Sequence, residues 1–283
     1  MLLGAHVSTA GGVRNAPLRA GEIGANAIQV FTKQPNRWAE PVCGEEDVRG
    51  FTGGVRERGI GFANSHDSYL INLATADPVL RERSLESFRA ELRRAVELDL
   101  DAVVTHPGNA TDGDRFRGLA QNAALVEQAL AEVPGRTLVL LETTAGAGTV
   151  LGATFEELAE MIERISPEHR ERVGVCLDTC HVYSAGYDLV QDYDGVWARF
   201  DDVIGLGRLR VLHLNDSKAP FASKKDRHEL IGEGSLGEAP FRRIMTDARL
   251  AHVPKILETP KGDDATATDT RMVGLLRGYE RAG

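Results

Sequence analysis

Short apolar runs and helical patterns alternate eight times along this chain of 283 residues. Each apolar run is rich in Val, Ile and Leu and nearly continuous, which is typical of strands buried on both faces of a sheet. The expected strands span residues 2–8, 27–33, 61–66, 102–107, 137–143, 173–179, 209–215 and 254–259. Between them, residues 81–98 and 155–165 carry apolar side chains at the spacing of one helix face, with Thr154 as the expected N-cap of the second helix.

Eight strand–helix units predict an α/β fold, a single closed (β/α)8 TIM barrel, which typically needs about 250 residues. An open doubly wound sheet is the alternative, but it usually carries a G-x-G-x-x-G turn after its first strand. Gly11 and Gly12 do not have that spacing, and no linker or low-complexity stretch divides the chain. We therefore expect one barrel domain over residues 1–283.

Composition bears on location and partners. The chain has no apolar run close to the ~20 residues that span a bilayer, and its first residues lack the features of a signal peptide. Three cysteines are too few and too irregularly spaced for a disulfide framework, so we expect a cytoplasmic protein with no membrane partner. The net charge of −9 argues against nucleic acid, yet Lys218, Lys224, Lys225 and Arg227 lie in one short segment. A local basic surface on an acidic protein stays open.

In a (β/α)8 barrel, chemistry takes place where the strands end. Nine imidazole and carboxylate side chains stand at or just beyond the ends of expected strands three to eight: His66, His106, Glu142, Asp178, His181, His213, Asp226, His228 and Glu258. Each alone is more often structural, but together over one barrel mouth they would be costly to desolvate without a function. Imidazole mixed with carboxylate favours zinc or manganese, and nine ligands suit three ions better than one. Such a cluster indicates hydrolysis of a phosphoester.

The motifs around these residues resemble the endonuclease IV family along nearly the whole chain. The matching stretches are LGAHVSTAGG at 3–12, HDSYLINL at 66–73, HPG at 106–108, ETTAGAG at 142–148, GVCLDTCH at 174–181, HLNDSK at 213–218, DRHELIGEG at 226–234 and ILET at 256–259. The resemblance implies a monomeric TIM barrel with three zinc ions, a deoxyribonuclease IV of the phage-T4-induced type. Such an enzyme cuts double-stranded DNA on the 5′ side of an abasic site, leaving a 3′-hydroxyl and a 5′-deoxyribose phosphate, and trims blocked 3′ ends.

The resemblance also implies ligand sets. His66, His106 and Glu142 would hold the first zinc; Glu142 would bridge to the second, completed by Asp178, His213 and Glu258; His181, Asp226 and His228 would hold the third. Glu142 and Glu258 would be the catalytic carboxylates, and manganese is an alternative occupant of some sites. In the family, hydroxide held by the first two metals attacks phosphorus in line, and the third metal stabilises the leaving 3′-oxygen. His6 is expected to support this site without binding metal.

DNA contacts are implied as well. In the family, side chains fill the gap left by a nucleotide flipped out of the helix, and Tyr69 and Leu70 match the inserting positions. In a second loop, residues 33–38, the family's arginine position holds Asn36, and Arg37 follows one step later. The full set of expected DNA contacts is Lys33, Asn36, Arg37, Tyr69, Leu70, Lys218 and Arg227.

Two other functions compete. A sugar isomerase or epimerase of the xylose isomerase-like class would need only Glu142, Asp178, His213 and Glu258, which would leave the other five candidate ligands without a role. A noncatalytic DNA-binding barrel would need none of the nine. Metal content separates the three possibilities: three zinc ions, one or two manganese ions, or none.

Overall fold

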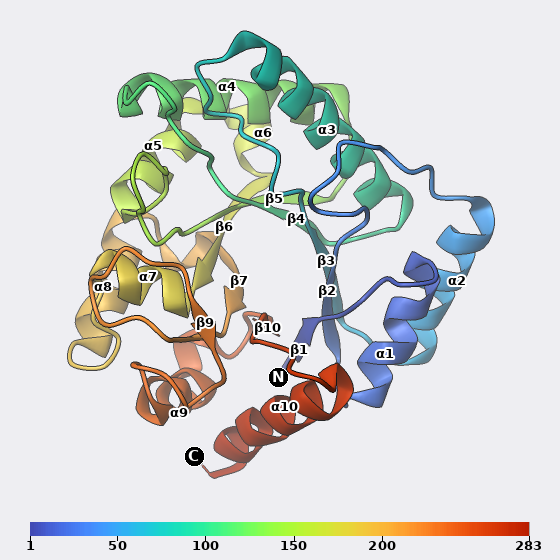
Figure 1. Cartoon of the computed structure of the whole chain (residues 1–283), viewed down its shortest axis with the longest axis vertical. Helices are drawn as coiled ribbons and strands as arrows, with labels where there is room; N and C mark the ends of the chain where they lie inside the picture. The colour runs from blue at the N-terminus through green and yellow to red at the C-terminus, as the bar shows by residue number, and fades with distance from the viewer. Residues whose placement is uncertain (283) are drawn as a thin grey trace.

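Eight parallel strands close into a barrel in the computed structural model, which describes residues 1–282 (Figure 1). The barrel strands are β1 (Leu3–His6), β2 (Ala27–Val30), β3 (Phe62–His66), β4 (Ala102–Thr105), β5 (Leu138–Glu142), β6 (Val173–Asp178), β7 (Leu209–His213) and β10 (Lys255–Leu257). Closure comes from the pairing of β1 with β10, in which Leu3 is in register with Lys255. The predicted (β/α)8 barrel is confirmed.

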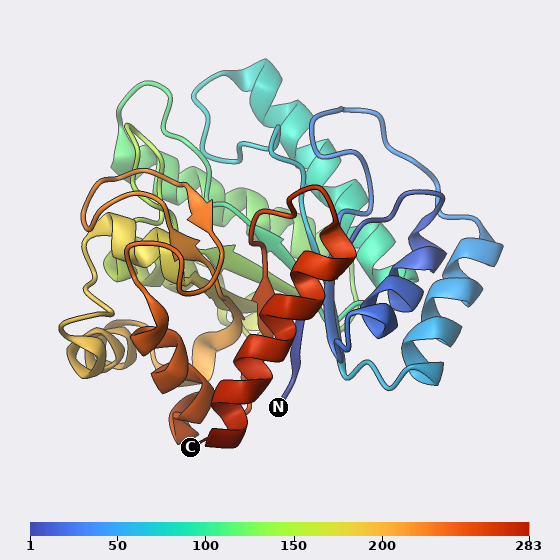
Figure 2. The ribbon, with the colours of Figure 1, turned by 60° about the horizontal axis from the view of Figure 1, so that its bottom comes forward.

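Helices surround the barrel on its outside (Figure 1). Their bounds are α1 (Ala16–Glu22), α2 (Glu45–Glu57), α3 (Pro78–Glu97), α4 (Arg115–Glu132), α5 (Phe155–Arg164), α6 (Pro167–Arg170), α7 (Thr179–Ala185), α8 (Tyr193–Val203), α9 (Glu238–Thr246) and α10 (Ala265–Ala282), with short 3-10 turns η1 (Val13–Asn15), η2 (Leu206–Arg208) and η3 (Ala248–Leu250). Helix α10 runs along the outside of β1 (Figure 2). Among residues 1–282, no helix combines the length and apolarity that crossing a membrane requires.

The element bounds follow from local signals. Helix α3 begins earlier than predicted because Asp77 caps it, accepting hydrogen bonds from the backbone N–H groups of Val79 and Leu80. The predicted cap of α5 is confirmed, since the Thr154 side chain accepts from the N–H of Glu157. Most strands are shorter than predicted because the chain turns away into a loop directly after the barrel wall, as at His6 and Val30.

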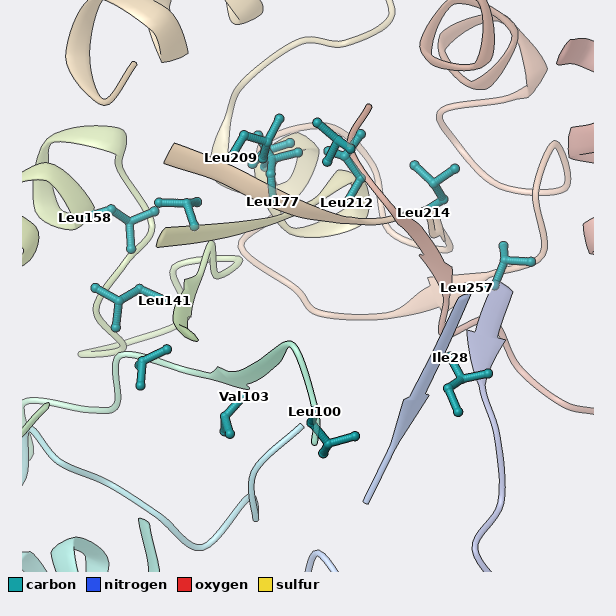
Figure 3. Packing of buried hydrophobic residues seen from close by; sticks show 14 of the residues in the cluster. Ile28, Leu100, Val103, Leu141, Leu158, Leu177, Leu209, Leu212, Leu214 and Leu257 are labelled. Atoms are coloured by element: carbon teal, nitrogen blue, oxygen red, sulfur yellow. The ribbon is translucent and has the colours of Figure 1, made fainter. Parts of the chain in front are cut away.

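Side chains alternate between the two faces of each barrel strand, so two apolar cores form. The first lies between barrel and helices and includes Leu141, Leu177 and Leu212 of the strands, with Leu158 of α5 (Figure 3). The second fills the barrel interior and consists of Ala27, Ala102, Val104, Leu140, Cys176, Val211 and Ile256. Side chains two residues further along a strand point the same way. The inward positions after this apolar layer are therefore those of the polar residues at the strand ends.

A small antiparallel hairpin was not predicted. Strands β8 (Asp216–Ser217) and β9 (His228–Glu229) pair in the segment that follows β7, so His228 lies in a short strand rather than in a loop. The buried carboxylate of Asp216 accepts hydrogen bonds from the backbone N–H groups of Ser217, Gly232, Gly234 and Leu236. Residue 234 must be glycine, because a Cβ there would lie 2.5 Å from the Asp216 carboxylate. Asp216 thus shapes the segment that carries two candidate ligands.

Candidate metal centre

The nine candidate ligands meet at the carboxyl ends of the barrel strands. Barrel strands or the residues directly after them supply His66, His106, Glu142, Asp178, His213 and Glu258; the first turn of α7 supplies His181; and the segment after β7 supplies Asp226 and His228. Apart from Asp226, their nitrogen and oxygen atoms form overlapping groups in which all ligand atoms lie within 4.8 Å of one another. The three groups that matter most are His66–His106–Glu142, Glu142–Asp178–His213–Glu258 and Asp178–His181–His228.

Glu142 is the residue on which the first two groups converge. It is fully buried, and its Oε2 lies 3.2 Å from His66 Nε2 and 3.3 Å from His106 Nε2. Its Oε1 lies 3.0 Å from His213 Nδ1 and 3.3 Å from His181 Nδ1. His181 Nδ1 also lies 2.8 Å from the Thr143 carbonyl, so the nitrogens left for ions are those of His66 and His106 on one oxygen and of His213 on the other. A carboxylate with imidazoles on both oxygens has the arrangement of a bridge between two ions.

The third group forms around Asp226 and His228. His181 Nε2 lies 3.2 Å from one Asp226 oxygen, and His228 Nε2 lies 3.3 Å from the other. His228 Nε2 also lies 3.6 Å from Asp178 Oδ2, so Asp178 is close enough to serve two groups. The structure therefore brings the expected third set together and adds Asp178 to its edge.

Charges in this cluster reinforce one another. Burial alone would raise the pKa of Glu142, but His213 and His106 hold it well below its ordinary value. In the same way, burial is outweighed at Glu258 by His213 and His6, so the pKa of that carboxyl also lies well below its usual range. Burial would lower the pKa of His66, yet Glu142 raises it to about 9. Both glutamates are therefore carboxylates at neutral pH, which is the form that binds a cation.

The donor set fits divalent metal ions. His228 Nε2 is buried and has no hydrogen-bond partner among the described residues, although it faces two carboxylates. A buried polar atom without a partner is costly, and a metal ion would satisfy it. Mixed imidazole and carboxylate ligands match zinc or manganese. Burial raises the pKa of the Cys176 thiol to about 12 and that of Cys180 to about 11. Cys176 lies in one group with Glu142 and His213, and Cys180 lies in another with Asp226 and His228.

Hydrogen bonds from outside the cluster orient its histidines. His66 Nδ1 lies 2.9 Å from the carbonyl oxygen of Asp67, and His181 Nδ1 lies 2.8 Å from that of Thr143. His213 Nε2 lies 2.8 Å from the side-chain oxygen of Gln29. Each contact uses one ring nitrogen and leaves the other to face the cluster, as in known metal sites. His6 contacts Gln29 and lies 3.6 Å from Glu258, which agrees with its expected supporting position.

Gln29 contacts the candidate ligands but was not predicted from the sequence. It is fully buried in β2 beneath the candidate ligands. A signal was present, because Gln29 is a polar residue two positions after inward-facing Ala27 in a strand expected to be buried. Polar residues within a strand, and not only those at its end, were therefore informative.

Most of the expected DNA contacts lie on the surface. Asn36, Arg37, Lys218 and Arg227 are exposed, and Leu70 is half-buried. Tyr69 is 66% exposed and packs edge-on against Phe31, with ring centroids 5.4 Å apart.

The side chain of Lys33 is buried in an ion pair, which corrects the expectation of a direct DNA contact. Its side chain is 2% exposed, and its ammonium nitrogen lies 2.6 Å from Glu40 Oε1 and donates to Ser87. The resemblance groups Lys33 with Arg37 as an expected DNA contact, but its partner Glu40 comes seven residues later in an irregular segment. No local pattern links the two.

Comparison with known proteins agrees with this geometry. A closed parallel barrel with imidazoles and carboxylates at the ends of its strands defines the class of the xylose isomerase-like TIM barrels, and the family model of that description matches residues 18–275. A relative from Chloroflexus aggregans, "Probable endonuclease 4", is 43% identical over 281 residues, 98% of this chain and 97% of the relative. The crystal structure of endonuclease IV from Thermus thermophilus has a TM-score of 0.88 and 36% identity over 100% of both chains. This chain belongs to the endonuclease IV family, as its motifs predict.

The same barrel fold also occurs in proteins with low sequence identity to this chain. A D-tagatose 3-epimerase-like protein has a TM-score of 0.72 with 17% identity, and the comparison covers 100% of this chain and 99% of that one. At that identity the likeness shows a common barrel and nothing about the reaction. The nuclease assignment therefore rests on the full-length endonuclease IV relatives and not on this wider likeness.

Proposed function

We propose that this metal-dependent endonuclease hydrolyses the phosphodiester on the 5′ side of abasic sites in double-stranded DNA. The products are a 3′-hydroxyl and a 5′-deoxyribose phosphate, and the same site trims blocked 3′ ends. The observation that carries the proposal is the position of Glu142 between His66 and His106 on one oxygen and His213 on the other, with Asp226 and His228 completing a further group beside it. The whole chain, residues 1–283, would act as one endonuclease domain.

The proposed occupants are three zinc ions, with manganese as an alternative at some positions. His66, His106 and Glu142 would hold the first, and Glu142, Asp178, His213 and Glu258 the second. His181, Asp226 and His228 would hold the third, with Asp178 close by. Bound there, such ions would supply a nucleophile at neutral pH and neutralise charge on the phosphoryl group and the leaving oxygen.

The protein's own groups prepare this site. Buried Glu142 and Glu258 stay ionised because histidines surround them, so they provide negative charge where cations must be held. The hydrogen bonds to the outer nitrogens of His66, His181 and His213 fix the direction of each ring. Fixed ligands keep the reacting phosphate in one geometry, which lowers the entropic part of the barrier.

DNA would be bound by the loops around the barrel mouth. Exposed Arg227 and Lys218, in the segment after β7, would contact phosphates, as would exposed Arg37 and Asn36 in the loop after β2. Tyr69 and Leu70, in the loop after β3, would enter the duplex where the abasic nucleotide leaves the stack. We also propose that the enzyme is a monomer in the reducing cytoplasm, in keeping with its three free cysteines.

The epimerase alternative uses too little of the site. Glu142, Asp178, His213 and Glu258 would suffice for it, yet His66 and His106 lie within 3.3 Å of Glu142. His228 in turn has a buried Nε2 that only a further occupant would satisfy. Five additional ligand-type side chains in contact with such a site favour the nuclease.

The test uses the purified protein and a duplex with one abasic site. We expect close to three zinc ions per chain and a single cut that leaves a 3′-hydroxyl, identified by extension with a polymerase and by mass spectrometry. An undamaged duplex of the same sequence is the control. A fully metal-loaded protein that leaves the abasic strand intact, or that carries one or two manganese ions and interconverts ketoses, would overturn the proposal.

A further inference from the structure

Gln29 occupies a central place beneath the metal centre. It lies in β2, in register with His6 of β1 on one side and with Asn64 of β3 on the other. Gln29 and Asn64 are both fully buried. A polar layer therefore separates the apolar interior of the barrel from the candidate ligands, and Gln29 crosses it from one wall to the other.

Every polar atom of the Gln29 amide has a partner. Its Nε2 donates to Glu258 Oε1 and lies 3.1 Å from His6 Nδ1. Its Oε1 accepts from Asn64 Nδ2 at 2.6 Å and lies 2.8 Å from His213 Nε2. The opposite orientation of the amide would set its oxygen against the Glu258 carboxylate, which can only accept. Chemistry therefore allows one orientation.

This orientation decides which nitrogen of His213 carries a proton. Because Gln29 Oε1 can only accept, His213 Nε2 must be the donor. The lone pair of neutral His213 is then on Nδ1, which lies 3.0 Å from Glu142 Oε1 and 3.2 Å from Glu258 Oε2. Within residues 1–282, Gln29 is the hydrogen-bond acceptor at His213 Nε2.

The same amide orients a second ligand. Gln29 Nε2 is bonded to Glu258 Oε1, so Oε2 is the oxygen that faces His213 Nδ1. His213 and Glu258 come from β7 and from the end of β10, whereas Gln29 comes from β2 across the barrel. The Gln29 side chain thus fixes the orientation of both His213 and Glu258, although its strand, β2, supplies no candidate ligand.

We propose that Gln29 is a positioning residue for the Glu142–Asp178–His213–Glu258 group, holding His213 in the Nε2–H form and Glu258 with Oε2 turned to the metal. The inference rests on the proposed function, since it concerns the same site. Partners of this kind typically change metal affinity by about 10–100-fold. Its loss should therefore weaken one ion of the set and leave the others in place.

The test compares Gln29→Met with Lys255→Met. Both replace a fully buried polar side chain of a barrel strand by methionine, but Lys255 bonds the backbone carbonyls of Leu250 and Val253 at the opposite end of the barrel. In a chelator titration followed by metal analysis, we expect Gln29→Met to release one zinc at a roughly 10–100-fold lower chelator concentration. Lys255→Met should match the wild type, and excess zinc should restore DNA cutting by Gln29→Met.

A spectroscopic measurement separates positioning from loss of structure. Nitrogen-15 NMR of the zinc-loaded protein should show a hydrogen-bonded Nε2 proton on His213 that is lost in Gln29→Met. Gln29→Glu retains the acceptor at His213 but sets an oxygen where the amide donated to Glu258 Oε1, so it should keep the His213 proton and still release zinc more readily than the wild type. Gln29→Glu also serves if the methionine variant does not fold. Unchanged zinc release and an unchanged His213 signal in a zinc-loaded Gln29→Met would overturn the inference alone. A wild-type protein without stoichiometric zinc would instead remove the proposed function and the inference with it.

Discussion

Lys33 and Glu40 form an ion pair with 2.6 Å between Nζ and Oε1, and the Lys33 side chain is 2% exposed. Arg94 of α3 joins them, since its guanidinium lies 2.6 Å from Glu40 Oε2 and 2.7 Å from Glu91. The pair therefore fastens the loop after β2, which carries Asn36 and Arg37, to helix α3. A basic residue at a barrel mouth holds a loop in place here rather than facing solvent.

Glu40→Gln tests this fastening. The substitution leaves the buried ammonium of Lys33 without its ion partner, which should lower the free energy of unfolding by about 1–3 kcal/mol. Binding of abasic duplex should weaken, while zinc content stays unchanged. Urea denaturation and fluorescence titration measure the two effects. Lys33→Met removes the buried charge together with its need for an ion partner, so it should lower the free energy of unfolding by less than Glu40→Gln does. If Lys33→Met lost much DNA affinity and Glu40→Gln lost none, Lys33 would again be assigned as a direct DNA contact.

Tyr69→Ala should impair work on DNA and spare the metal centre. The ring is 66% exposed and makes an edge-on contact with Phe31, so its removal leaves no buried cavity. Loss of one stacked aromatic typically costs about 1–3 kcal/mol, and cleavage of abasic duplex should fall by roughly 10–100-fold. Single-turnover cleavage and zinc analysis check this. Unfolding or loss of zinc in this variant would show that Tyr69 is a structural residue.

His228→Ala should remove one zinc and most of the catalysis. An ion at a leaving oxygen stabilises the transition state more than the bound substrate, so cleavage should fall on the order of a thousandfold while DNA affinity persists. The control is His252→Ala, an exposed histidine outside the site. Metal per chain, duplex affinity and single-turnover rate are measured on both variants. Full zinc content with unchanged cleavage would contradict the three-ion assignment.

Arg227→Ala should change the salt dependence of DNA binding. The side chain is exposed in a segment that also carries Lys224 and Lys225, despite the net charge of −9. Each phosphate contact contributes about −0.9 to the slope of log affinity against log salt, so this variant should reduce the magnitude of the slope by about 1. Titrations between low and moderate salt provide the slope. A wild-type protein with a flat response would rule out an electrostatic DNA surface.

The buried side chain of Lys255 should make the stability of the protein depend on pH. Burial lowers the pKa of Lys255 to about 8, although its ammonium still donates to two backbone carbonyls. Between about pH 8 and the unfolded value near 10.5, the unfolded chain binds the extra proton, so stability rises with pH. Relative to Lys255→Met, the wild type should gain on the order of 3 kcal/mol across this window. Urea curves for the two proteins at several pH values would reveal this gain, and parallel behaviour at all pH values would contradict it.

The sequence predicted what depends on short-range order along the chain. Barrel strands are recognisable as continuous apolar runs, and a residue at a strand end, such as His66 or Glu258, must lie at the same rim as the others. Contacts between side chains whose positions depend on the tertiary fold could not be predicted from the sequence. The pairing of Glu40 with Lys33 and Arg94 depends on the path of an irregular loop, and the two-residue strands β8 and β9 are too short to leave a periodic pattern.

The four backbone hydrogen bonds to Asp216 give the segment after β7 a closed stem, continued by the bond from the Lys218 N–H to the Arg227 carbonyl. His228 belongs to this stem, whereas residues 219–225 form the tip beyond it. This tip is itself bonded to α7, because the N–H groups of Ala222 and Lys224 donate to the carbonyl oxygens of Tyr183 and Ser184. The segment that carries Asp226 and His228 is thus coupled to the helix that carries His181, and a change in the length of the tip would displace both sides of the candidate site together.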